Sequence, residues 1–411
     1  MIIDQLKTLS AQAKRLVLMR FLVYTGFQSS YYVGVIGTLT YADGATVAST
    51  SLAVVLMNAF FILGSFAGGS ALDAWGPRRH YFASTVAIVA TGAFLFTFGG
   101  AQAVLFLGAA LMGFLMGCTQ VVFTSYPVYL TSDAGELQTI NSVITTLSNV
   151  SVVLGPLAGG ALSAAFGSLA VFPFMAAFAA AGLVTGLGFH PLVTPQKVTG
   201  DDAGKTTGAA DDATSDPTFA DSVRYVATHG LLSLMFWVIF LANFGYGAFD
   251  PLESFFYRDV LHVSVDWMGW LSAASGVGGI LGALAVMRLP KERVGINTLL
   301  VALIFMGVGS LVYVGTPFVV VAFMGQIAVG IGWGAVTPLH STLVQTNAPM
   351  AMMGRVNSVM TFGSMVAGVA PLAVAPWLAS VFGVQQTLIG AAATVVVVPF
   401  VILAFRRIRT K

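Results

Sequence analysis

Two carboxylic acids, Asp250 and Glu253, are the residues of this chain whose type and position best suit proton chemistry. Both lie inside a long apolar stretch, where an ionised carboxylate is costly unless it is hydrated or paired. Pro251 stands between them and weakens the helix, which permits bending. We therefore interpret both acids as proton-coupling residues. The alternative is that both lie in an outer, water-filled vestibule and pair with Arg258.

Other polar and aromatic side chains recur at helical spacing, which marks helix faces turned away from lipid. The candidate substrate-binding residues are Tyr24, Gln28, Tyr31, Asn58, Phe61, Met116, Gln120, Asn243, Tyr246, Trp270, Gln326 and Trp333. Together they predict an aromatic, amide-rich cavity that is poor in fixed charge. Such a cavity suits a moderately hydrophobic molecule, including a cationic one, better than a sugar phosphate or an inorganic anion. Any one of them could instead form only a helix-to-helix hydrogen bond. Arg20 shares a face with Tyr24 but is expected to extend its charge to the membrane interface.

The composition requires a membrane protein. Of the 411 residues 57% are hydrophobic and only 8% are charged, with a mean hydropathy of +0.88. The apolar runs are long and unbroken and do not alternate every second residue, which indicates transmembrane helices rather than a barrel. The single cysteine, Cys118, excludes an intramolecular disulfide and a cysteine zinc site.

Twelve transmembrane helices are predicted, in two pseudo-symmetric six-helix halves. The expected spans are 17–40, 48–71, 80–99, 103–129, 138–164, 168–188, 231–257, 265–287, 296–315, 317–343, 356–381 and 384–405. Each has about the 20–25 residues that a tilted helix needs. Residues 190–229 are polar and are expected to form a flexible cytoplasmic linker between an N-terminal half, 1–189, and a C-terminal half, 230–411.

Basic residues indicate the orientation, because they favour cytoplasmic loops. If the N-terminus is inside, only Arg258 of the 18 Lys and Arg residues falls on the outer side. We therefore expect a multi-pass protein of the cell membrane with both termini in the cytoplasm.

The chain contains an internal repeat. Residues 141–167 and 357–383 both begin with Asn-Ser-Val and end with Phe-Gly, and they match at several positions between. In addition, Gly113 and Gly117 correspond to Gly330 and Gly334. Two similar halves in the same order are the arrangement that alternating-access transporters use.

Two motifs suggest gating. The loop at 69–79 combines glycines, an acid and two arginines that could form a latch with Arg355, whereas the alternative is that these are ordinary interfacial charges. The glycines at 155–160 allow close helix approach and Pro156 adds a bend; ordinary small-residue packing would explain the glycines alone. The candidate gating residues are Gly69, Asp73, Gly76, Arg78, Arg79, Gly155, Pro156, Gly159, Gly160 and Arg355.

These motifs resemble those of the major facilitator superfamily. The loop at 69–79 is similar to that family's signature Gly-x-Leu-Ala-Asp-Arg-x-Gly-Arg-Arg. The segment 151–160 is similar to the fifth-span signature Gly-x-x-x-Gly-Pro-x-x-Gly-Gly of its twelve-span drug/proton antiporter branch, with Ser151 in place of the first glycine. The resemblance implies a secondary active transporter, with proton-coupled efflux of small amphipathic or hydrophobic compounds of the multidrug type.

Several alternatives stay open at this point. On the same fold the chain could be an inward facilitator or symporter, or a flippase for lipid-like substrates. A membrane receptor or scaffold without transport is the alternative of another class. No enzyme motif, cofactor motif or metal-ligand spacing is present, so we expect no enzyme activity, no cofactor, no metal and no catalytic residue. The expected partners are a small-molecule substrate, protons and membrane lipid, without nucleic acid, and the expected state is a monomer.

Overall fold

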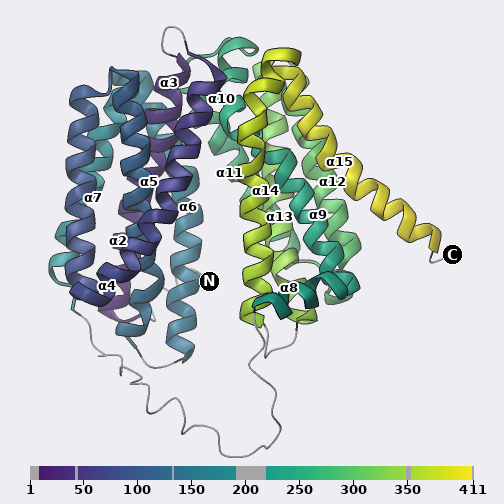
Figure 1. The fold of residues 1–411 in the computed structure, drawn as a ribbon, viewed down its shortest axis with the longest axis horizontal. Helices are drawn as coiled ribbons and strands as arrows, with labels where there is room; N and C mark the ends of the chain where they lie inside the picture. Colours follow the sequence, from purple (N-terminus) through teal and green to yellow (C-terminus); the bar gives the residue numbers. More distant parts are fainter. Residues whose placement is uncertain (1–8, 42–44, 132–133, 191–218, 349–352, 410–411) are drawn as a thin grey trace, which may run out of the picture.

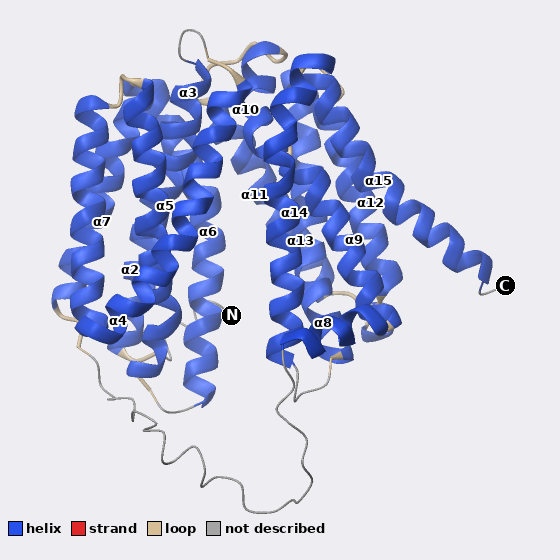
Figure 2. Cartoon of the chain, in the orientation of Figure 1, coloured by secondary structure: helices blue, strands red, loops and turns tan. Residues whose placement is uncertain are grey.

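The computed structural model describes residues 9–41, 45–131, 134–190, 219–348 and 353–409. Every regular element in these ranges is a helix (Figure 2). The first group comprises α2 (Ala11–Ser29), the π-helix η1 (Ser30–Gly37), α3 (Thr38–Tyr41), α4 (Val47–Phe98), α5 (Gln102–Ser125), η2 (Tyr126–Tyr129), α6 (Ala134–Phe166), η3 (Ser168–Ala170) and α7 (Val171–Leu187). The second group comprises α8 (Phe219–Thr228), α9 (Gly230–Gly247), α10 (Phe249–Asp259), α11 (Trp267–Met287), η4 (Lys291–Arg293), α12 (Ile296–Val314), α13 (Val319–Asn347), α14 (Met353–Phe382) and α15 (Val384–Arg409).

The helices confirm the predicted all-helical membrane fold. In the described residues, 11 helical stretches are long and apolar enough to cross a membrane, and each corresponds to one predicted span. The remaining predicted span, 17–40, is built from α2, η1 and α3, which follow one another without a gap. This stretch contains basic residues and a change of helix type, which explains why it lacks one long apolar helix.

The helix α4 contains two predicted spans joined by a sharp turn. Gly76 has φ 73° and ψ 163°, a conformation that glycine adopts readily because it has no Cβ. Pro77 follows at the start of the next helical stretch, where its missing N–H costs little. The chain therefore turns at Gly76 and Pro77 within the motif at 69–79.

The repeated glycines make equivalent contacts in the two groups of helices. A Cβ on Gly113 or Gly117 of α5 would collide with the backbone of α4, at the carbonyls of Met57 and Phe61 respectively. Gly330 and Gly334 of α13 approach the backbone of α11 in the same way. These close backbone contacts stabilise each pair of helices through van der Waals packing rather than through side-chain burial.

The two groups of helices stand side by side and approach each other at the end that carries α3 and α10 (Figure 1). At this end one hydrophobic cluster contains residues of both groups, among them Ile36 and Val54 from the first, and Leu252, Phe256 and Leu271 from the second. The opposite end carries α8 and the ends of α6 and α13.

The polar segment expected as a linker is helical over part of its length. Residues 219–228 form α8, and His229 caps the start of α9 by accepting a hydrogen bond from the backbone N–H of Leu232. Residues 191–218 of the expected linker lie outside the described residues.

Candidate proton and substrate site

A helix break positions the two candidate acids. Helix α9 ends at Gly247, and α10 begins at Phe249, so that Pro251 falls in the first turn of the new helix. A Cβ on Gly247 would collide with the Gly368 carbonyl, so α14 can approach the break this closely only because the residue is small. The break directs Asp250 and Glu253 towards η1 of the first group of helices.

Glu253 is the centre of a hydrogen-bonded cluster. Its Oε2 accepts from the Tyr32 hydroxyl of η1. Its Oε1 accepts from the Tyr313 hydroxyl of α12 at 2.8 Å and from Gln326 Nε2 of α13 at 2.7 Å. Gln326 Nε2 also lies 3.4 Å from the Tyr257 hydroxyl. All these donors are neutral side chains, so the Glu253 carboxyl group is held by three hydrogen bonds and by no described cation.

Asp250 takes part in the same contact between the groups of helices, because its Oδ2 accepts from the Tyr31 hydroxyl at 3.4 Å. Three further hydrogen bonds join the groups here. Thr40 Oγ1 donates to Ser254 Oγ at 2.7 Å, the Tyr41 hydroxyl donates to the Val263 carbonyl at 2.7 Å, and Arg258 Nη1 donates to the Thr40 carbonyl. With the bond from Tyr32 to Glu253 there are five hydrogen bonds between the two groups of helices, and we call these five bonds the junction. In the described part of the chain, no other hydrogen bond connects a residue before 190 to one after 219.

Arg258 does not pair with either candidate acid. Its Nε lies 2.6 Å from Asp259 Oδ1, and this is the one ion pair between described residues. The alternative in which Arg258 neutralises Asp250 and Glu253 is therefore wrong for this conformation. The two acids instead depend on phenol and amide donors.

Two predicted substrate residues of the second group, Tyr246 and Trp333, belong to a row of aromatic rings that leads to the acid cluster. The Tyr246 ring stacks on Phe249 at 4.9 Å between centroids and on Trp333 at 6.1 Å. Phe249 in turn stacks on Tyr313, the donor to Glu253. Gln326 is 4% exposed and belongs to the acid cluster, which makes it unavailable as a free cavity amide.

The other predicted substrate residues do not join this row. Asn58 and Asn243 each donate to a carbonyl of their own helix, so neither amide donor bridges to a neighbouring helix. Trp270 is half-exposed on α11. Phe61, Met116 and Gln120 are half-buried on α4 and α5, while Tyr24 and Gln28 are half-buried on α2.

The fifth-span glycines contact two different partners. A Cβ on Gly155 or Gly159 would meet Gln28 or Ser29 of α2, within the same group of helices. A Cβ on Gly160 would lie 2.5 Å from the Asp266 carbonyl and 3.0 Å from Gly269 Cα, at α11 of the other group. The motif therefore brings the α6 backbone against both α2 and α11, which favours the interpretation that its packing also affects gating.

The predicted latch is described only in part. Arg78 Nη2 donates to the Leu187 carbonyl at 3.2 Å, at the end of α7, and its Nη1 lies 3.4 Å from His190 Nδ1. A Cβ on Gly69 would meet no atom within 4 Å, so this glycine makes no close helix contact here. The side chains of Asp73 and Arg355 lie outside the described residues, and the latch stays a prediction.

Arg20 contradicts the expected extension to the interface. It is only 6% exposed, and its Nε donates to Ser148 Oγ of α6 at 3.0 Å. The guanidinium carbon lies 4.1 Å from the centre of the Tyr24 ring and 5.3 Å from that of Phe123. The charge is therefore held inside the first group of helices, between α2, α5 and α6.

Sequence reasoning missed Tyr32 and Tyr313 as partners of Glu253. Tyr32 is adjacent to Tyr31, and neighbouring residues of a regular α-helix point in different directions. The π-helix η1 changes this geometry over Ser30–Gly37, and both tyrosines reach acids of α10. The signal for Tyr313 was its polar hydroxyl near the end of an otherwise apolar span.

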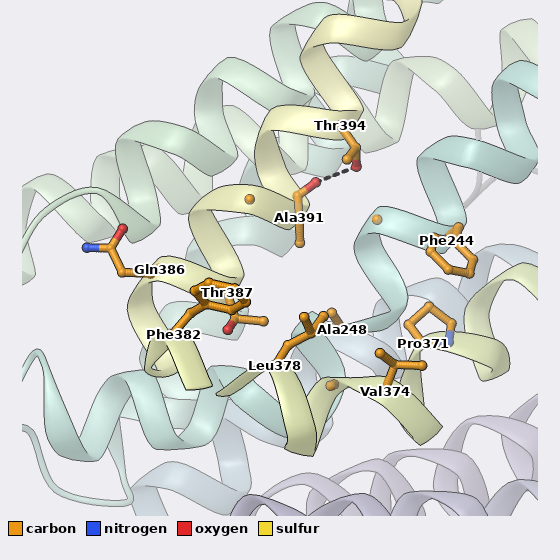
Figure 3. Close-up of a pocket in the computed structure, with 13 residues that line it drawn as sticks. Phe244, Ala248, Pro371, Val374, Leu378, Phe382, Gln386, Thr387, Ala391 and Thr394 are labelled. Carbon is orange, nitrogen blue, oxygen red and sulfur yellow. Dashed lines mark hydrogen bonds between the residues drawn. The ribbon is translucent and has the colours of Figure 1, made fainter. Parts of the chain in front are cut away.

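A separate cavity of about 380 Å³ lies between α9, α14 and α15 (Figure 3). Its lining is almost entirely apolar and includes Phe244, Val374, Leu378 and Phe382. Thr394 Oγ1 is already bonded to the Ala391 carbonyl at 2.7 Å. None of the predicted substrate residues lines this cavity, and the strong exposure of Phe382 places the cavity at the surface that faces lipid.

The fold and the junction define a multi-pass helical membrane protein in which two acids lie where two helix bundles meet. The chain belongs to the major facilitator superfamily, whose family model matches residues 16–371. It is accordingly a secondary transporter of small molecules and not an enzyme.

Similar proteins and structures agree with this family. The multidrug efflux pump Tap of Mycobacterium tuberculosis (strain ATCC 25618 / H37Rv) is 26% identical over 275 residues, which cover 64% of this chain and 60% of that protein. Tap of Mycolicibacterium fortuitum is 29% identical over 142 residues, covering 34% and 35%. This chain therefore matches about three-fifths of the length of the first relative and one-third of the second.

Solved structures show the same fold at low identity. The nucleoside transporter NupG superposes with a TM-score of 0.70 at 15% identity, covering 96% of this chain and 99% of that chain. An auto-inhibited peptide transporter of the POT family gives 0.70 at 13%, with 97% of both chains covered. A D-xylose-proton symporter gives 0.69 at 13%, covering 94% and 96%.

Proposed function

We propose that this transporter exports small amphipathic compounds of the multidrug type in exchange for protons, by alternating access. The observation that carries the proposal is the position of Asp250 and Glu253 in the junction, where they accept hydrogen bonds from Tyr31 and Tyr32. The distant similarity to the efflux pump Tap supports export.

The chemistry of the junction supports proton coupling. A hydrogen bond to an ionised carboxylate is about twice as strong as one between neutral groups. Binding a proton to Glu253 or Asp250 therefore weakens the bonds from Tyr32 or Tyr31 and favours separation of the helix groups at this end. Loss of the proton favours the closed junction seen here.

The proposed arrangement has a six-helix half on each side of the linker, 1–189 and 230–411, with both termini and the linker in the cytoplasm. The junction then closes the outer face. The latch of Asp73 with Arg78, Arg79 and Arg355 would close the inner face in the opposite conformation. The transported compound binds between the halves, in a single chain surrounded by lipid.

Cysteine labelling tests this orientation. Gly100 and Gly295 lie at opposite ends of the helices, and a Cβ at either position meets no atom within 4 Å. In a Cys118→Ser background, Gly100→Cys is expected to react with a membrane-impermeant maleimide from outside intact cells. Gly295→Cys is expected to react only after the membrane is opened. The reverse pattern would contradict the orientation.

Transport in proteoliposomes tests the proposed activity. With the purified chain in one orientation and an imposed pH gradient, we expect uptake of amphipathic dyes into the acidic lumen. The measurement is dye accumulation with and without the gradient, with protein-free liposomes as the control. Equal dye movement without a gradient would contradict proton coupling, and movement of dye and protons in the same direction would contradict exchange.

A further inference from the structure

The environment of Arg20 differs from that of an ordinary surface arginine. The side chain is 6% exposed and is enclosed by Tyr24, Phe123 and Ser148. Its Nε donates to Ser148, while Nη1 and Nη2 donate to no described residue. The two Nη atoms therefore carry four N–H groups that have no hydrogen-bond acceptor among the described residues.

This arrangement leaves the positive charge without a counter-ion among the described residues, because the one ion pair there joins Arg258 to Asp259. A buried cation is costly unless it is paired. The two aromatic rings recover part of this cost through cation–π attraction, which they direct at the flat face of the guanidinium. The edge with the Nη atoms stays available, and a planar fork of N–H donors matches the geometry of a carboxylate.

The position of Arg20 on the first span also suggests that it binds a ligand. Arg20 lies on the same face of α2 as Tyr24 and Gln28, at intervals of four residues, and Tyr31 follows in the π-helix η1. Tyr31 bonds Asp250 in the junction. The face therefore runs from a buried cation through aromatic and amide side chains to the candidate proton acid.

We propose that Arg20 binds the carboxylate of the transported compound, with the Tyr24 ring beside it. The substrate class is then an amphipathic molecule that carries both an apolar body and an acidic group. This inference rests on the proposed function, and it adds a negatively charged group to a substrate class that the sequence alone described as neutral or cationic.

A matched pair of fluorescent probes tests the proposal. Dansyl-glycine carries a carboxylate, whereas dansyl-glycinamide has nearly the same shape without the charge. Binding of each is measured by fluorescence titration of the full chain in neutral detergent at one pH. The wild type is expected to bind the acid at least about 10-fold more tightly than the amide, as one charge-assisted bidentate contact would give.

Variants assign this preference to Arg20. Arg20→Gln is expected to bring the two affinities within about threefold of each other by weakening the acid alone. Arg20→Lys, which keeps the charge but lacks the planar fork, is expected to retain part of the preference. Arg224→Gln removes a positive charge from the exposed surface of α8 and should retain all of it.

Three outcomes would overturn the proposal. They are equal affinities of the wild type for the two probes, absence of saturable binding of the acid, and an unchanged preference in Arg20→Gln. If Arg20→Gln does not give a monodisperse protein, the comparison of Arg20→Lys with the wild type decides. The binding experiment uses no pH gradient. Its result therefore does not depend on whether transport is coupled to protons, and equal binding of the two probes would not contradict proton-coupled transport.

Discussion

Glu253→Gln is expected to abolish pH-driven accumulation of substrate, a loss of at least about 10-fold, while exchange without a gradient continues. The substitution removes the titratable group and converts one acceptor oxygen into an N–H donor. Tyr32, Tyr313 and Gln326 then compete for a single carbonyl oxygen, where they previously shared a carboxylate. The measurement is accumulation in proteoliposomes with and without a pH gradient.

Asp250→Asn is the matched comparison. Asp250 accepts one hydrogen bond at 3.4 Å, against three for Glu253, so its replacement is expected to reduce accumulation less. Asp250 lies deeper in the predicted span than Glu253, but it has fewer hydrogen-bond donors. Normal gradient-driven accumulation in Glu253→Gln would exclude Glu253 as the coupling acid, and a complete loss in Asp250→Asn alone would transfer that role to Asp250.

Gly160→Ala is expected to impair transport strongly although it changes one methyl group. The new Cβ would lie 2.5 Å from the Asp266 carbonyl and 3.0 Å from Gly269 Cα, so α6 and α11 must move apart. Alanine favours a helix over glycine by about 1 kcal/mol, so loss of local helix stability cannot explain the effect. Gly390→Ala is the control, because a Cβ there meets no atom within 4 Å.

A disulfide between Thr40→Cys and Ser254→Cys reports whether the junction closes. The hydroxyl oxygens of these residues lie 2.7 Å apart, so the cysteines should crosslink readily in the Cys118→Ser background. Adding Gly160→Ala should slow this crosslinking several-fold, whereas adding Gly390→Ala should not. Equal crosslinking and transport in the two variants would show that the α6–α11 contact has no role in gating.

Most of the fold could be predicted from the sequence, because a bilayer requires long apolar helices. Runs such as 265–287 and 296–315 therefore nearly coincide with α11 and α12. The site was less predictable. Asp250 was identified by the cost of a charge in lipid, but its partner Tyr31 belongs to a π-helix that a regular period does not describe.

Arg20 shows a different limit of sequence reasoning. An arginine near the end of a span normally extends to water, and nothing in its own helix indicates otherwise. Its burial results from Phe123 and Ser148, which lie more than one hundred residues away and form the other side of its enclosure. Contacts of this kind depend on how helices pack, and the spacing within one helix does not encode them.

The repeated glycine contacts also bear on the free-energy difference between the two conformations of the proposed transport cycle. Within each bundle the α4–α5 and α11–α13 pairs touch backbone to backbone, so a rotation of one bundle against the other needs no rearrangement of side chains inside either. The two conformations then differ in energy mainly through the thin layer of groups where the bundles meet. An energy change of 1.4 kcal/mol already alters the ratio of two states tenfold. In the proposed cycle, one proton or one ligand contact is therefore enough to reverse the balance between the two conformations.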